Sequence, residues 1–173
     1  MSITLVVENS QGAPSPNNYV VGANTYVTLD YVDTYFADTG DTAWTGTDEE
    51  KKAAIVKACR YINETYRLQF QGYRFNPMNQ PMDWPRWGVY DEQGFPMKIV
   101  PIELQNAQCE AAKRALTQTM IPDVDIGGQP ISIDVEGARI QYQPGASPLP
   151  HFPEIDRVIG RCLRGIGFRV ERA

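Results

Sequence analysis

The chain has 173 residues and a net charge of −5, with 42% hydrophobic and 21% charged residues. This length and composition fit a single globular domain over residues 1–173. No apolar run approaches the roughly 20 residues that span a bilayer, and the opening residues MSITLVVENS have no basic leader, so neither a membrane segment nor secretion is expected. An acidic chain is also repelled overall from phosphate-rich partners.

The N-terminal region, residues 1–24, is predicted to form a short strand followed by an arm. Residues 3–7 read ITLVV, a β-prone run, so a strand is expected over residues 2–7. Residues 11–18 follow with glycine, prolines, serine and asparagines, which are typical of turns.

Two capping signals predict the first helices of a helical core over residues 25–121. Thr28 suits the N-cap of a helix that runs to about residue 38. Thr47 and Glu50 have the spacing of a capping box, and the helix that follows is expected to run to about residue 68. Its buried stripe is predicted from the helical spacing of apolar residues: Ile55, Cys59, Ile62, Tyr66 and Phe70.

A third helix is predicted after Pro101, which suits a first helical turn, and Pro122 is expected to end it. Its inner side carries small residues, which let a neighbouring helix come close: Leu104, Ala107, Ala111 and Ala115. Alternating apolar residues within 126–143 predict a β-hairpin. A last helix and tail are expected over residues 153–173. The predicted fold is mainly α, a small bundle of about four helices with this hairpin, the N-terminal strand and one long loop.

The long loop, residues 71–101, is rich in proline, glycine and aromatic residues. Connections this long are uncommon in compact domains and are usually functional or disordered. Its rings carry too much apolar surface for a solvated linker, so an ordered, irregular loop is expected. We predict that it contacts a neighbouring subunit or another protein, through Phe75, Trp84, Arg86, Trp87, Tyr90 and Phe95.

The sequence offers little for catalysis, and we expect no enzyme, cofactor or metal site. The single histidine, His151, lies between prolines in a spacer, with no nucleophile motif pointing to it. Asp123 begins a string that resembles a calcium loop, but Gly127 stands at one ligand position and strand-forming residues follow, so an Asp-rich turn is expected. The acidic residues 48–50 are explained by a helix N-terminus.

The three cysteines, Cys59, Cys109 and Cys162, are widely spaced and lie on predicted helices. We expect buried, reduced thiols of a cytoplasmic setting.

Positive charge gathers at the C-terminal end. Residues 151–173 carry five arginines and three acidic residues, so this segment has a net charge of +2 and the rest of the chain −7. The arginines are Arg157, Arg161, Arg164, Arg169 and Arg172. The first three have the spacing of one helix face, and such a basic end suits an acidic partner or another copy of the chain.

Single-stranded DNA is the alternative partner. Arginines 60, 67, 74 and 86 are interleaved with aromatic residues 61, 66, 73, 84 and 87, and binders of single strands combine such groups for phosphates and bases. Against this, Tyr66 lies on the predicted core stripe and the chain is acidic overall. We therefore favour core packing and loop anchoring for these rings.

The order of these elements resembles a known family. The matching pieces run from LVVE near the N-terminus through ANTYVTLDYVDTYF, Trp44-Thr45-Gly46, Phe70 to Arg74, Trp84-Pro85-Arg86 and residues 102–112. Together they resemble the head–tail connector adaptor proteins of tailed bacteriophages. Related sequences are often labelled DnaT-like single-stranded-DNA-binding proteins. The likeness covers about residues 5–116, with a weaker echo at 152–156.

The resemblance implies a structural virion protein of the phage neck, assembled in the host cytoplasm. Such subunits form a ring, typically dodecameric, beneath the portal protein, extend the DNA channel and dock the next neck or tail component. In the family the C-terminal segment tends to engage the portal, which corresponds here to residues 153–173. DNA would pass an acidic wall without specific binding.

Overall fold

The computed structural model describes residues 2–8, 15–91, 93–122, 132–135, 138–141 and 152–164. Within these ranges the fold is mainly α, as predicted. The helices are α1 (Leu29–Thr39), α2 (Asp48–Tyr66), α3 (Ile102–Ala115) and α4 (Pro153–Ile159), the last continued by a short 3-10 helix, η2 (Gly160–Cys162). Two antiparallel strand pairs are β1 (Tyr73–Arg74) with β2 (Arg86–Trp87), and β3 (Ser132–Val135) with β4 (Ala138–Gln141).

The helix starts follow the predicted caps. The Thr28 hydroxyl accepts a hydrogen bond from the Tyr31 backbone N–H at 3.0 Å. At α2 the capping box is complete, because Thr47 accepts from the Glu50 N–H and the Glu50 carboxylate accepts from the Thr47 N–H at 2.8 Å. These bonds satisfy backbone donors that a helix leaves unpaired at its first turn.

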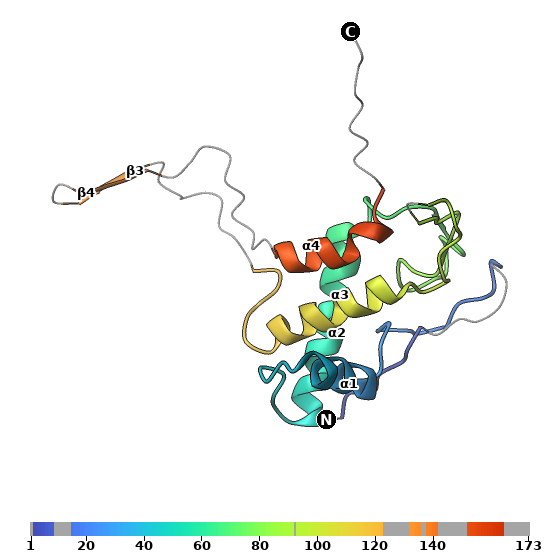
Figure 1. Cartoon of the computed structure of the whole chain (residues 1–173), viewed down its shortest axis with the longest axis horizontal. Helices are drawn as coiled ribbons and strands as arrows, with labels where there is room; N and C mark the ends of the chain where they lie inside the picture. The colour runs from blue at the N-terminus through green and yellow to red at the C-terminus, as the bar shows by residue number, and fades with distance from the viewer. Residues whose placement is uncertain are drawn as a thin grey trace, which may run out of the picture.

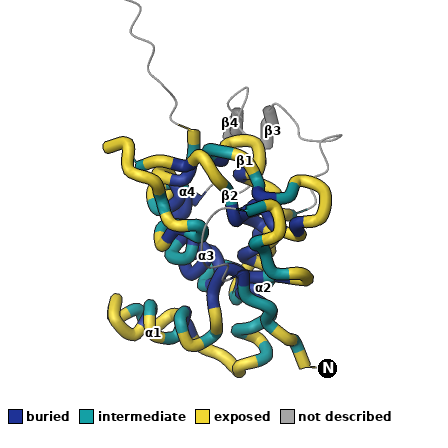
Figure 2. The backbone as a smooth tube through the Cα atoms, turned by 90° about the vertical axis from the view of Figure 1, so that its right-hand side faces the viewer, coloured by how far each residue is buried: buried dark blue, intermediate teal, exposed yellow. Residues whose placement is uncertain are grey.

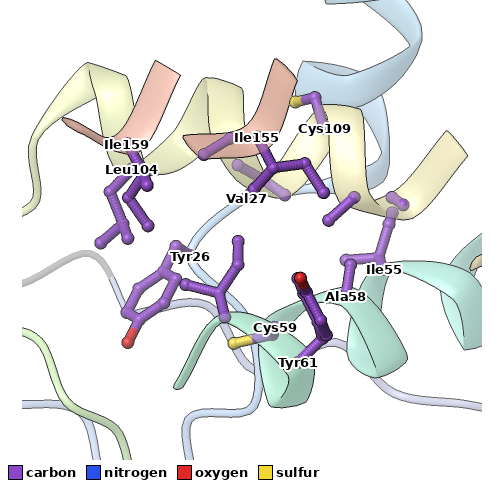
Figure 3. Packing of buried hydrophobic residues seen from close by; sticks show 14 of the residues in the cluster. Tyr26, Val27, Ile55, Ala58, Cys59, Tyr61, Leu104, Cys109, Ile155 and Ile159 are labelled. Carbon is purple, nitrogen blue, oxygen red and sulfur yellow. The ribbon is translucent and has the colours of Figure 1, made fainter. Parts of the chain in front are cut away.

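The core lies between α2 and α3, with α4 packed on α3 and α1 at the other end of the molecule (Figure 1). Figure 3 shows side chains from three of these helices meeting there, with Ile55, Leu104 and Ile155 each 0% exposed. Ala107 and Ala111 of α3 are also fully buried. As predicted, small residues on α3 let the two central helices approach closely.

A buried polar side chain ties the segment before α1 to this core. The Gln108 side chain accepts from the Tyr26 N–H at 2.9 Å and donates to the Thr25 hydroxyl at 2.8 Å and the Ile55 carbonyl at 3.0 Å. Because buried amides are costly when unpaired, these three bonds fix residues 25–26 against both α2 and α3.

The N-terminal strand is not formed, which corrects the prediction. Val7 makes one isolated parallel bridge with Thr25. The neighbouring backbone bonds go instead to Asn24, which donates to the Val6 carbonyl at 2.9 Å and accepts from the Val6 N–H through its side chain at 2.9 Å. A β-prone run becomes a strand only where a partner strand is available.

Three helix ends also lie earlier than predicted. Helix α2 ends at Tyr66, α3 at Ala115 and the C-terminal helix at Cys162, the end of η2. Pro122 therefore does not end α3, which stops six residues sooner with its cap at Leu116. The predicted hairpin is confirmed, with Ser132 opposite Gln141 and Val135 opposite Ala138.

All three cysteines are buried and free, as expected. Burial raises the pKa of each of the Cys59, Cys109 and Cys162 thiols to about 12. Within the described ranges, no helix is long and apolar enough to cross a membrane, and no three potential metal ligands gather. His151 and Asp123 lie outside the described residues.

Candidate functional site

The long loop folds onto the end of the molecule that carries α4 and η2, opposite α1 (Figure 1). Figure 2 shows buried and exposed stretches alternating along it, around β1 and β2. The loop is ordered, as predicted, although it contains the β1–β2 pair and an isolated bridge between Tyr90 and Pro96.

Two of the predicted interface residues are core residues. Trp84 is 0% exposed and Phe75 is 2% exposed. The Trp84 ring meets Phe70 edge-on at 5.8 Å between centroids, and its backbone N–H donates to the Tyr26 hydroxyl at 3.3 Å. Neither ring is available to a partner, because both are buried. The first half of the loop thus adds apolar surface to the core formed by the helices.

The loop arginines are bound internally. Arg86 donates to the carbonyls of Gln71 at 2.6 Å, Gly72 at 2.8 Å and Asp83 at 3.2 Å. Its burial lowers the pKa of its guanidinium, with the charges of Arg164 and Arg74 acting in the same direction and Asp83 opposing them. Arg86 therefore organises the loop backbone, and its role as an interface contact stays a prediction.

The arginines suggested for DNA are paired as well. Arg67 and Arg74 both lie beside the Asp83 carboxylate, at 3.1 and 3.7 Å, and that side chain is 2% exposed. Arg60 pairs with Glu64 one helical turn away at 2.8 Å. Of the rings in that set, Tyr61, Tyr66 and Trp84 are buried. Core packing thus accounts for these three rings, as favoured from the sequence.

The second half of the loop presents an aromatic ridge, defined as Tyr73, Trp87, Tyr90 and Phe95, which are 72%, 38%, 53% and 65% exposed. Tyr73 and Trp87 lie opposite each other in the β1–β2 pair, so their side chains are neighbours. Trp87, Tyr90 and Phe95 were predicted to be interface residues, and all three are exposed. Tyr73 was not named among the interface residues from the sequence. Its position beside Trp87 follows only from the pairing of β1 with β2.

The backbone around the ridge is tightly specified. Gly72 has φ +64°, and a Cβ there would lie 2.1 Å from the Trp87 carbonyl oxygen. Further along, the Asp91 carboxylate accepts from the N–H groups of Gln93 at 2.9 Å and Phe95 at 2.8 Å. These contacts hold Trp87 and Phe95 in place although their rings face solvent, so the ridge is pre-organised.

Residues 163–164 are hydrogen-bonded to the segment at the start of this loop. Leu163 forms an antiparallel bridge with Phe70, and the Arg164 N–H donates to the Gln69 carbonyl at 2.6 Å. The Gln71 side chain donates to the Leu163 carbonyl at 2.9 Å. Arg161, Leu163 and Arg164 therefore share one face with the aromatic ridge, and this face is here called the docking face.

A cleft of about 540 Å³ lies between the ridge and η2. We call it the glycine cleft, because Gly72, Gly88 and Gly160 line it together with Tyr90, Arg161 and Arg164. Arg161 is 64% exposed and makes one long ion pair with Glu103 at 3.5 Å. Arg164 is exposed, and its Nε donates to the Phe70 carbonyl at 3.1 Å.

The predicted arginine face is only partly formed. Because the helix ends at Cys162 and Leu163 is extended, Arg164 lies beyond the helix and does not continue the stripe of Arg157 and Arg161. Arg157 is exposed on α4 but does not line the glycine cleft. Arg169 and Arg172 lie outside the described residues.

The residues of the docking face lie within a stretch of sequence that matches a known family. A family model described as "Putative DnaT-like ssDNA binding protein" matches residues 3–173. The chain belongs to this family. The matched range of the DnaT-like family includes the entire loop and the C-terminal arginines, so the docking face lies within it. No curated protein and no solved structure matches the chain.

The docking face offers two kinds of contact surface. It combines an aromatic ridge, which provides apolar and stacking surface, with two exposed guanidinium groups at the edge of a cleft. Asp91 also lines the cleft, and its carboxylate already accepts backbone N–H groups of its own turn.

Proposed function

We propose that this chain is a non-enzymatic assembly protein, the head–tail connector adaptor of a tailed phage particle. In this role copies of the chain form a ring, taken as dodecameric, under the portal protein. The ring extends the DNA channel and docks the next neck or tail component. It acts in the virion neck and is assembled in the host cytoplasm, without a membrane.

The observation that carries the proposal is the aromatic ridge on a rigid, charge-neutral loop. Residues 71–101 carry three basic and three acidic side chains. Exposed rings held in fixed positions are the typical anchors of protein–protein interfaces, because they bury much apolar area at little entropic cost. The order of sequence elements described above supports the phage neck as the setting.

The absence of a chemical role is part of the same proposal. The three thiols are buried, and a pKa of about 12 leaves almost no thiolate at neutral pH. A net charge of −5 suits a channel wall that DNA passes without adhering, because phosphate binding requires clustered cations.

The direct test is electron microscopy of the purified protein mixed with the portal protein encoded by the same genome. We expect closed rings stacked coaxially on the portal. A variant with Trp87→Ala and Tyr90→Ala should fold, because both rings are exposed, and should lose ring formation or stacking. A matched variant, Val21→Ala with Ile121→Ala, removes two exposed apolar side chains outside the loop of residues 71–101 and should assemble normally. Persistent monomers of the wild-type protein in the presence of portal would contradict the proposal.

Single-stranded DNA binding is the second candidate, favoured by the description of the family. The Tyr73–Trp87 pair provides a stacking surface of the kind that single-strand binders use. Fluorescence anisotropy with a labelled oligothymidylate at about 0.15 M salt separates the two candidates. The adaptor predicts no appreciable binding. The DNA-binding candidate predicts binding that weakens steeply with salt and is lost in the double ridge variant.

A further inference from the structure

We infer that the glycine cleft binds an extended, acidic peptide segment of a partner protein. The inference rests on the proposed assembly function and adds the chemistry of the partner at the docking face. It assigns the cleft a role separate from that of the aromatic ridge, whose rings lie on one side of it.

The walls of the cleft suit an extended chain. Gly72, Gly88 and Gly160 present backbone and no side chain, so a peptide backbone can approach closely. A Cβ built on Gly160 meets nothing within 4 Å, and one on Gly88 meets only the Cα of Gly72 at 4.0 Å. Leu163, which also lines the cleft, has the extended backbone angles φ −89° and ψ 152°. The volume of about 540 Å³ is of the order that a few residues of extended peptide occupy.

Charge selects an acidic occupant. Arg161 and Arg164 bring two guanidinium groups to the cleft, and Arg86 lies close enough behind Arg164 for the two positive charges to interact. Among the described residues that line the cleft, Asp91 is the acidic one, and its carboxylate accepts two backbone N–H groups. A carboxylate that entered between Arg161 and Arg164 would meet two exposed guanidinium groups, of which Arg161 also forms an ion pair with Glu103 at 3.5 Å, with donors arranged for paired hydrogen bonds.

A peptide fits these observations better than a nucleic acid. A single strand requires a line of cations that follows its phosphates, whereas the other loop arginines are bound to Asp83 or to carbonyls. One or two carboxylates on an extended peptide match the two available guanidinium groups.

The test is a titration of the isotopically labelled full chain, followed by the backbone amide signals of Gly72, Gly88 and Gly160 in NMR spectra. The probes are a capped peptide of alternating glutamate and leucine, the same peptide with lysine for glutamate, and an oligothymidylate. We expect the acidic peptide alone to shift the three glycine signals. Absence of a shift at millimolar acidic peptide overturns the inference. A response to the oligothymidylate alone assigns the cleft to DNA and equally overturns it.

Two variants sharpen this titration, each with a matched control. Gly160→Leu fills the cleft at a position whose backbone is helical, with φ −51°, and where an added Cβ meets nothing within 4 Å. Ala37→Leu adds one carbon atom less on the exposed face of α1, away from the docking face. Arg161→Glu reverses a charge in the cleft, and Arg157→Glu does so on the same helix outside it. We expect the cleft variants to weaken peptide binding by about tenfold or more and the controls by less than about twofold.

The same variants keep this inference separate from the proposed function. If the wild-type chain stacks on the portal and the two cleft variants stack equally well, the cleft inference fails and the adaptor function stands. If the wild-type chain binds the acidic peptide but assembles with no neck protein, the adaptor function fails and the cleft remains a peptide site.

Discussion

Two tryptophans three positions apart in one loop have opposite roles. Trp84 is fully buried against Phe70, whereas Trp87 is 38% exposed beside Tyr73. Both residues are tryptophans in the same proline-rich stretch, so local composition does not predict which of them is buried. The first half of the loop completes the core, and the second half displays rings that the first half holds in position.

The comparison shows how a rigid surface is built from an irregular chain. Internal carbonyls and one buried carboxylate, Asp83, bind the loop arginines. These bonds fix the loop backbone that carries the exposed rings. A pre-organised surface of this kind loses little conformational entropy when a partner binds.

The largest expected effect separates the two tryptophans. Trp84→Ala should lower the free energy of unfolding by about 3–5 kcal/mol, because it leaves a large cavity in the core. Trp87→Ala should lower it by about 1 kcal/mol or less. Urea unfolding followed by circular dichroism measures both. Similar losses for the two variants would show that the halves of the loop are not distinct.

Gly72 connects the two halves, and its substitution should have the next largest effect. Gly72→Ala places a Cβ against the Trp87 carbonyl at a positive φ, and should cost roughly 2–4 kcal/mol. Gly94→Ala is the control, since its φ is also positive, +85°, but nothing lies within 4 Å of the added Cβ. It should cost about 1 kcal/mol in thermal or urea unfolding. An equal cost at both positions would exclude the steric contact as the cause.

Tyr66 and Tyr73 compare a buried hydroxyl with an exposed one. The Tyr66 hydroxyl donates to the Asp156 carboxylate and joins α2 to α4. Tyr66→Phe should cost about 1.5–3 kcal/mol, whereas Tyr73→Phe should leave stability unchanged within error. No difference between the two variants in urea unfolding would show that this bond contributes nothing net.

The same hydroxyl predicts a pH dependence. Burial, followed by the bond to Asp156, raises the pKa of Tyr66 above its ordinary value of 10.0. The unfolded state then loses the phenol proton first, so this residue makes the free energy of unfolding fall as pH rises above about 10. The fall should be smaller in Tyr66→Phe, measured by urea unfolding between pH 9 and about 11.

The smallest expected effect is a gain in stability. Gly160→Ala should raise the free energy of unfolding by about 0.5–1 kcal/mol, because the backbone there is helical and alanine restricts the unfolded chain. Thermal unfolding measures the gain. A loss of stability would mean that the cleft wall does not tolerate a side chain, and it would remove the basis for filling the cleft with leucine.

Local signals were sufficient where the interacting groups are close in sequence. The capping box of Thr47 and Glu50, the cap at Thr28 and the hairpin within 126–143 were all predicted, because a few neighbouring residues determine each. The buried stripe of α2 was also predicted, since helical periodicity places Ile55, Cys59 and Ile62 on one side. The strand expected at residues 2–7 failed because a strand requires a partner that local sequence does not provide.

The site was harder to predict for the same reason. The loop was recognised as ordered and suited to contact, and three of its six named residues, Trp87, Tyr90 and Phe95, are exposed. Phe75 and Trp84 were misassigned to an interface, and the backbone contacts of Arg86 were not foreseen, because their environment comes from Tyr26, Phe70 and the carbonyls of Gln71 and Gly72. Most of these contacts join residues far apart along the chain or across a turn.

The amino-acid sequence by itself determined the helices, the acidic body with its basic end, and the presence of an ordered aromatic loop, since periodicity, capping and composition are local or additive properties. The tertiary structure alone decided which rings are buried, which arginines bind the loop backbone, and that residues 163–164 lie beside the loop. Those outcomes depend on the bridge between Phe70 and Leu163, on the hydrogen bonds around it and on packing between distant segments. Whether a side chain is buried depends on the residues that pack around it in the folded protein, and these are not determined by the residue's own type.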